Sequence, residues 1–139
     1  MKKNLIIKWF AIVLISVSTF ASCNLLNNKE DFQKILVKTA EDLSKKCPQT
    51  IDTDTRLDNV SALPNELRYQ YTLVNYNLED LNADTFKLLM QPNLFNLAKT
   101  NPDLKIFRDN KTTLTWVYND KSGKFITQIS ATEKEYQSK

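Results

Sequence analysis

The sequence contains no histidine, and its single glycine is Gly123. The absence of histidine excludes serine–histidine triads and histidine-ligated metal sites. One glycine is too few for the glycine-rich loops that cradle phosphate groups. Most of the common enzymatic motifs are therefore excluded. We expect a protein that is not an enzyme and that has no catalytic residue, no cofactor and no metal site.

Cysteine is also scarce, with only Cys23 and Cys47 in 139 residues. Cys47 follows Leu43 by four residues on the apolar side of a predicted helix, which directs its thiol toward the core. A nucleophilic cysteine needs a lowered pKa and normally a neighbouring base, and only lysines and carboxylates are available here. We therefore predict that Cys47 is buried and structural, and that no intramolecular disulfide forms if Cys23 is modified.

The first 23 residues have the layout of a secretory signal. Three lysines, Lys2, Lys3 and Lys8, precede or border the apolar run 9–15, and small residues follow it. The run is too short to span a bilayer. We therefore expect residues 1–22 to be a signal peptide that is removed from the protein.

The segment Phe20-Ala21-Ser22-Cys23 resembles the lipobox of bacterial lipoproteins. In that family the chain is cut just before the cysteine, and the cysteine thiol is acylated. The resemblance implies lipidation at Cys23, secretion across the inner membrane, and anchoring by lipid to the cell envelope at its periplasmic face or at the cell surface. The alternative is an ordinary signal peptide that is cut nearby, with Cys23 incidental.

The net charge of +3 comes from this N-terminal segment. Residues 1–22 contain three lysines and no acidic residue, so the rest of the chain carries 16 basic and 16 acidic side chains. A net charge near zero gives no reason to expect nucleic-acid binding. The remaining length suits one domain with one modest core. We place this domain at residues 30–139, after a lipidated N-terminus and short polar spacer at residues 23–29.

Hydrophobic periodicity predicts helices and hairpins in alternation. Apolar residues recur at helical spacing in 29–47 and in 78–100, and the second pattern keeps its phase across Pro92, which predicts one kinked helix. Residues 103–108 are interpreted as a connecting turn or an edge strand. Period-two alternation predicts strands at 55–63, 67–73, 112–119 and 125–131. The order predicts an α+β fold, helix-hairpin-helix-hairpin, with an antiparallel sheet of about four strands and helices on one face.

Two further groups of residues invite a chemical interpretation. Asp52, Asp54 and Asp58 have the spacing of acids in a calcium loop. Arg56 lies among them and no glycine is near, so we expect a solvated entry to a strand. Aromatic residues on two strands suit a stacking platform, but they share the alternation phase of neighbouring leucines, so we expect them in the core. These aromatic residues are Tyr69, Tyr71, Trp116 and Tyr118.

The opposite side of the predicted sheet carries polar residues around a few apolar ones. Such a mixture suits a partner-binding surface, and it also suits an ordinary solvated sheet face. A small anchored domain without catalytic groups acts through contacts, so we interpret this side as partner-binding. The residues that we assign to it are Arg68, Gln70, Thr72, Thr115 and Gln128.

The part of the chain after the signal also resembles small uncharacterised secreted bacterial proteins. In these proteins a helix and a Cys-Pro pair precede a Thr-Arg-Leu strand and a Tyr-Gln-Tyr-Thr-Leu strand. The matching residues here are Cys47-Pro48, Thr55-Arg56-Leu57 and 69–73. This second resemblance implies no particular activity.

Taken with the lipobox, these patterns predict a lipid-anchored cell-envelope protein that acts as a non-enzymatic binding or accessory module. Its expected partners are the membrane, through the lipid anchor, and another envelope or secreted protein, with no nucleic acid and no small-molecule cofactor. Two alternatives remain open. One is an immunity or inhibitor protein against a secreted toxin or hydrolase, and the other is a small envelope enzyme that uses carboxylates.

Overall fold

The computed structural model describes residues 20–137, and it describes side chains from residue 28 onward. Residues 1–34 and 35–139 form two units, and each is described by itself. The predicted signal peptide lies almost entirely outside the described residues, and so does the Cys23 side chain. The proposed division at residues 22 and 29 therefore stays a prediction.

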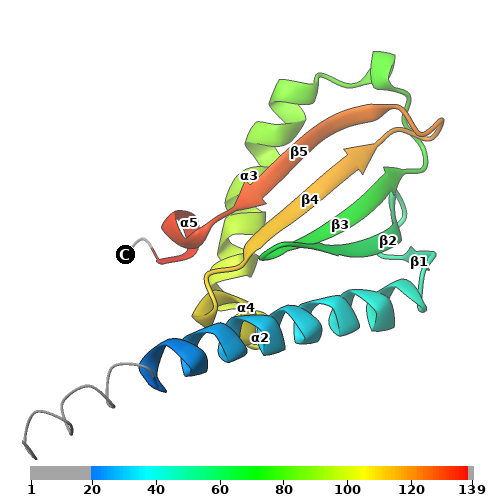
Figure 1. The fold of residues 1–139 in the computed structure, drawn as a ribbon. Helices are drawn as coiled ribbons and strands as arrows, with labels where there is room; N and C mark the ends of the chain where they lie inside the picture. The colour runs from blue at the N-terminus through cyan, green and yellow to red at the C-terminus, as the bar shows by residue number, and fades with distance from the viewer. Residues whose placement is uncertain (1–19, 138–139) are drawn as a thin grey trace, which may run out of the picture. The chain divides into compact units, whose positions relative to one another are not determined.

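The elements alternate between helices and strands (Figure 1). A long helix comes first, and short connections join the helices and strands that follow it. In chain order the elements are α2 (Phe20–Ser44), β1 (Gln49–Thr50), β2 (Thr55–Leu63), β3 (Glu66–Leu73), the 3-10 turn η1 (Leu78–Asp80), α3 (Ala83–Thr100), the 3-10 turn η2 (Pro102–Leu104), α4 (Lys105–Asp109), β4 (Thr113–Asn119), β5 (Phe125–Ala131) and α5 (Glu133–Gln137).

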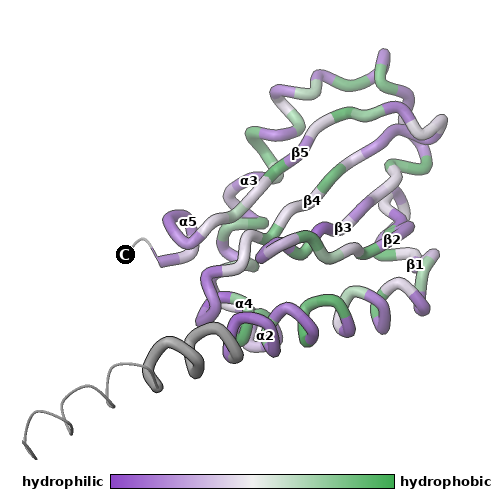
Figure 2. The backbone as a smooth tube through the Cα atoms, in the orientation of Figure 1, coloured by the Kyte–Doolittle hydropathy of each residue, from purple (hydrophilic) through white to green (hydrophobic). Residues whose placement is uncertain are grey.

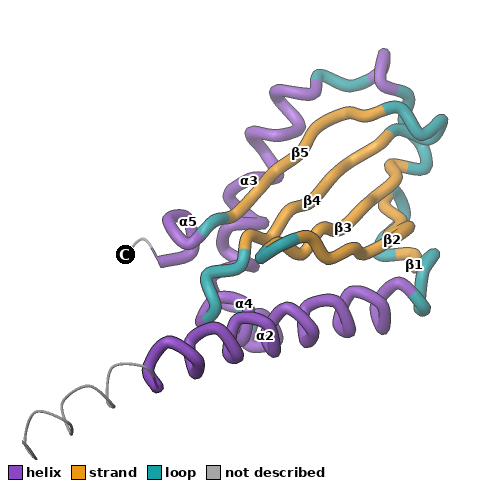
Figure 3. Tube along the Cα trace, viewed as in Figure 1, coloured by secondary structure: helices purple, strands orange, loops and turns teal. Residues whose placement is uncertain are grey.

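The strands form one five-stranded sheet in the order β1-β2-β3-β4-β5 (Figure 3). The predicted α+β class and the order of helices and hairpins are confirmed. The sheet is mixed rather than wholly antiparallel, because β3 and β4 pair in parallel. A parallel pair needs a crossover connection. Helix α3 supplies it, because it returns the chain to the end of the sheet at which β3 begins. The fifth strand is β1, which has only two residues and pairs with the start of β2.

The pleat separates two faces of this sheet, along which apolar and polar residues alternate (Figure 2). Register places Tyr69 beside Trp116 and Tyr71 beside Tyr118, so all four rings lie on one face. Phe86 of α3 packs edge-on against Tyr118, with ring centroids 5.1 Å apart, so α3 covers this inner face. The aromatic residues are therefore core residues, as predicted.

Helix α3 begins at Ala83 because the side chain of Asn82 caps it by accepting a hydrogen bond from the Thr85 amide at 2.9 Å. The helix continues through Pro92 to Thr100, so the prediction that one helix spans this proline is confirmed, while the predicted kink stays a prediction. Its predicted first turn at Leu78 is instead the separate turn η1.

Two segment predictions can be compared with the structure. Residues 103–108 form parts of η2 and α4, so the segment is a connection, as one of the two predicted alternatives had it, and not an edge strand, because Asn101 and Pro102 start a new turn as soon as α3 ends. Helix α2 is already formed before Lys29, the predicted first residue, and within the described residues it includes the predicted spacer, which contains no glycine or proline to stop it. At its other end, the Ser44 hydroxyl donates to the Val60 carbonyl at 3.0 Å, which fixes this end to β2.

Candidate functional site

The outer face of the sheet is the side that carries Arg68, Gln70, Thr72, Thr115 and Gln128. Strand register brings these five residues together. Arg68 lies beside Thr115, and Gln70 lies beside Val117, which in turn lies beside Gln128. Because neighbours in register share a face, the predicted grouping of these side chains is present in the structure. Whether the face binds a partner stays a prediction.

The outer face is tied together by hydrogen bonds between its own side chains. Asn59 donates to Gln70 at 3.4 Å, and the hydroxyls of Thr115 and Ser130 lie 3.0 Å apart. Gln128 also donates to the Ser130 hydroxyl, at 3.3 Å. These contacts link β2 to β3 and β4 to β5 across the face.

The outer face is less solvated than predicted. Thr72 and Thr115 are buried, while Arg68, Gln70 and Gln128 are half-buried. The short threonine side chains lie on central strands, where the longer side chains beside them exclude water. Three half-buried polar side chains therefore surround two buried hydroxyls.

The carboxylate of Asp58 holds neighbouring side chains in place at the β2 side of the outer face. Asp58 accepts hydrogen bonds from Arg56 and from Thr72, both at 2.5 Å. Burial alone raises the pKa of Asp58, but the hydrogen bonds from Arg56 and Thr72 and the charge of Arg56 outweigh it and lower the pKa. Asp58 is therefore ionised at neutral pH and paired with Arg56. It is not available to join Asp52 and Asp54 around a cation.

A cleft opens on the inner face, between the sheet and α3, with a volume of about 590 Å³. Its apolar part is formed by α3 and by the strands below it, and its mouth by the segment 51–55. Both carboxylates in the lining, Asp52 and Asp54, belong to this segment, and no lysine or arginine lines the cleft. The principal apolar and aromatic lining residues are Tyr71, Leu73, Phe86, Met90, Trp116 and Tyr118.

The aromatic wall of the cleft is rigid because its rings contact one another. Tyr71 and Tyr118 stack with ring centroids 5.3 Å apart. Burial, and secondarily the nearby Cys47 thiol, raises the pKa of Tyr71 to about 12. Burial also raises the pKa of Tyr118, with further contributions from Tyr71 and Asp52. Both phenols therefore keep their protons at neutral pH and can donate hydrogen bonds.

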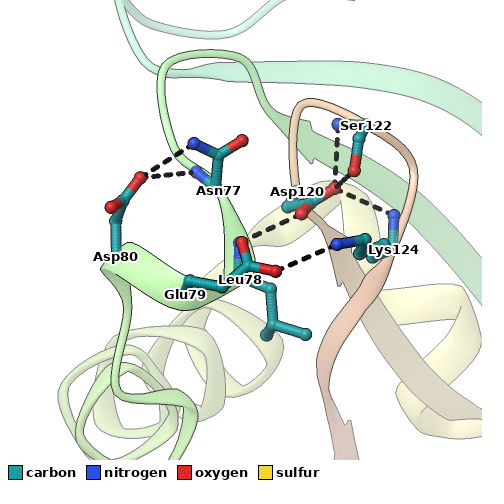
Figure 4. A network of polar contacts seen from close by, with 7 residues as sticks. All are labelled: Asn77, Leu78, Glu79, Asp80, Asp120, Ser122 and Lys124. Carbon is teal, nitrogen blue, oxygen red and sulfur yellow. Dashed lines mark hydrogen bonds and ion pairs between the residues drawn. The ribbon is translucent and has the colours of Figure 1, made fainter.

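The loop between β4 and β5 holds the turn η1 in place (Figure 4), and Tyr76 and Leu81, which flank η1, line the cleft. Asp120 is buried there, and its carboxylate accepts from the Leu78 amide at 3.0 Å and from the Ser122 and Lys124 amides at 2.8 and 2.9 Å. Lys124 also pairs with Glu79 at 3.0 Å. These bonds hold η1 in place and thereby position the cleft residues on either side of it.

Cys47 is half-buried rather than buried, which corrects the prediction. Its thiol donates weakly to the Leu43 carbonyl at 3.5 Å, so it points back along α2 rather than into the core. Burial, followed by the negative charge of Asp58, raises the pKa of the Cys47 thiol. A protonated thiol is a poor nucleophile, which agrees with the structural role predicted for this residue.

The sequence predicted the outer face but not the cleft. The cleft residues come from β1–β2, β3, α3 and β4, and nothing in the sequence brings these segments together. Only the structure gives a signal, because the apolar lining residues Ile51 and Leu97 are 51% and 40% exposed. In the sequence, Ile51 looks like an ordinary residue at the entry to a strand, and Leu97 looks like an ordinary residue in the apolar stripe of a helix.

Three solved structures share this fold. A protein of Pseudomonas aeruginosa described as secreted has a TM-score of 0.66 and 14% identity, covering 78% of this chain and 96% of its own. The type 2 secretion system pilotin EpsS of Vibrio vulnificus has a TM-score of 0.64 and 12% identity, covering 81% and 98%. The type II secretion system pilotin AspS of Vibrio cholerae has a TM-score of 0.61 and 14% identity, covering 80% and 97%. At these identities the likeness shows the fold alone.

Residues 31–127 match the family model of a domain of unknown function, DUF8479. The chain belongs to the DUF8479 family. None of the curated proteins compared with the chain matches it in sequence. The DUF8479 match contains four of the five outer-face residues and ends one residue before Gln128. Within residues 20–137 of this DUF8479 protein, no helix is both long and apolar enough to cross a membrane.

Proposed function

We propose that the protein is a lipid-anchored, non-enzymatic accessory module of the cell envelope, held by an acylated Cys23, which binds another envelope or secreted protein through the outer face. The observation that carries this proposal is the assembly of Arg68, Gln70 and Gln128 as half-buried polar side chains on one side of the sheet. Half-buried polar side chains that are already held by their neighbours can offer their remaining polar atoms to a partner at little cost in side-chain entropy.

The structural comparisons support the accessory role. Two of the proteins that share the fold over nearly their whole length are pilotins of a type 2 secretion system. Accessory proteins of this kind act by binding other proteins and do not catalyse a reaction. The lack of histidine in the entire chain agrees with such a role.

The test is a charge reversal at the outer face. Arg68→Glu combined with Gln128→Glu should reduce recovery of co-purifying envelope proteins. The reason is that two carboxylates replace two hydrogen-bond donors of the outer face, the guanidinium of Arg68 and the amide of Gln128. Arg68 now pairs with Glu66 at 2.9 Å, and both side chains are partly exposed. We therefore expect the free energy of unfolding to change by no more than about 1 kcal/mol.

The control carries the same change in charge at another place. Lys134→Glu combined with Gln137→Glu lies on α5, where both residues are exposed, and it should leave recovery unchanged. If the outer-face variant folds and keeps every partner, the proposal is wrong. If the recovered partner is a secreted toxin or hydrolase, the immunity or inhibitor function is favoured instead.

A further inference from the structure

The cleft on the inner face is a second site, separate from the outer face, because the two lie on opposite sides of the sheet. Its volume of about 590 Å³ falls within the range of sites that hold small ligands. All of its lining residues lie within residues 51–118, so it belongs to one unit of the chain. The cleft is therefore a formed pocket rather than a gap between units.

One buried polar group opens into this cleft. The Tyr118 side chain is only 3% exposed, and among residues 28–137 its hydroxyl has no hydrogen-bond partner. Every fully buried side-chain nitrogen or oxygen in this part of the chain does have a partner. The Tyr118 hydroxyl is therefore not fully buried, and because Tyr118 lines the cleft, water held beside a bound molecule can satisfy this hydroxyl.

The charge of the cleft has one sign. Asp52 and Asp54 lie at the mouth, and the remaining lining residues are neutral. The Asp52 carboxylate accepts hydrogen bonds from the Asp54 and Thr55 amides at 2.9 and 2.8 Å. The bond from Asp54 contributes most, and together with the bonds from Thr55 it outweighs the opposing effect of burial and lowers the pKa of Asp52. Asp54 accepts from the Asn75 amide group at 2.7 Å. The Asp52 carboxylate is therefore charged at neutral pH, and both acids are held in fixed positions beside the apolar part of the cleft.

We propose that the cleft binds a small amphiphile with an apolar body and a cationic head group. The apolar body would lie between α3 and the aromatic wall, in contact with Phe86, Met90 and Trp116. The cationic head would lie at the mouth beside Asp52 and Asp54, close to aromatic faces that also attract cations. An anionic or neutral head would gain neither interaction.

The binding can be followed at a single atom. The chain has only two methionines, Met1 and Met90, and Met90 lines the cleft. Full-length protein labelled with 13C in its methionine methyl groups should be titrated with decyltrimethylammonium, decyl sulfate and decyl maltoside, each below its micelle-forming concentration. We expect the Met90 signal to shift with the ammonium compound at a Kd at least about tenfold lower than with the sulfate or maltoside. Higher salt should reduce this preference.

Two pairs of variants test the location. Asp52→Asn combined with Asp54→Asn should remove most of the tenfold preference, whereas Asp103→Asn, on η2, should not. An asparagine keeps the single oxygen that accepts both amide hydrogen bonds at position 52, and at position 54 it keeps an oxygen for the bond from Asn75. Leu97→Lys places a positive charge in the lining of the cleft, at a residue that is already 40% exposed, and should abolish ammonium binding. Leu89→Lys is on the same helix, is 67% exposed and does not line the cleft, so it should have no effect.

Several results would overturn the proposal. These are an unmoved Met90 signal, equal affinity for the three head groups, or ammonium binding that survives Leu97→Lys. A basic apolar peptide that shifts Met90 when the ammonium compound does not would assign the cleft to a protein segment instead. The outer-face variant Arg68→Glu with Gln128→Glu should leave ammonium binding intact, which separates failure of this proposal from failure of the accessory function.

Discussion

At the scale of single residues, the environment of each ionisable group decides whether it can do chemistry. Cys47 is the clearest case, since the residue that sequence alone made the candidate nucleophile has a raised pKa. With Cys23 replaced by serine, alkylation of Cys47 by iodoacetamide should be slow at neutral pH. Its rate should still be rising above pH 9, because more thiolate forms as pH increases.

The control for this experiment is the same protein in denaturant, where Cys47 should react as a free thiol and its rate should level off at a lower pH. A native rate that levels off below pH 8 would show a lowered pKa and reopen the catalytic interpretation. The structural role of Cys47 stays a prediction, and its predicted burial is wrong. The reason is that Pro48 ends the helix beside it, so the thiol lies at the margin of the core.

At the scale of elements, the contact between η1 and the β4–β5 loop depends on Asp120. Burial raises the pKa of Asp120, but hydrogen bonds from Ser122, Lys124 and Leu78 outweigh this and lower the pKa to about 2. An unfolded aspartate titrates near pH 4. The stability that this carboxylate contributes is thus fully present above about pH 4 and is lost as pH falls toward about 2.

Chemical denaturation of the wild type and Asp120→Asn at several pH values checks this prediction. The variant should unfold at a clearly lower denaturant concentration at pH 6, since an amide cannot accept all of these hydrogen bonds. The difference should shrink between pH 4 and pH 2. A constant difference over this range would mean that Asp120 acts through shape and not through its charge.

Local elements were predictable, while their pairing was not. The predicted strand 55–63 has the bounds of β2, and 125–131 has those of β5, because alternation and turn residues mark both ends. The parallel pairing of β3 with β4 was missed because it depends on the path of α3 over the sheet. The residues of the outer face were still assigned to one side of the sheet, since side-chain alternation is the same for parallel and antiparallel neighbours. The cleft was not predicted, because its existence depends on the position of α3.

At the scale of the whole molecule, the proposed envelope function depends on the lipid anchor. Cys23→Ser should abolish labelling with radioactive palmitate and release the protein from membranes, since stable anchoring needs more than one acyl chain and the acylated cysteine carries them. Cys47→Ser is the matched control and should label normally. Unchanged labelling of the Cys23 variant would leave an ordinary signal peptide as the explanation of residues 1–23.

The most direct test of the central claim is site-specific photo-crosslinking from the outer face of the lipidated protein in its own membranes. A photoreactive residue at Gln70, in the middle of the outer face, should give one discrete crosslinked product. The same residue at exposed Lys134 should not. The product should disappear when Arg68→Glu and Gln128→Glu are added. Equal products from both positions, or none from Gln70 in correctly folded and anchored protein, would contradict the account.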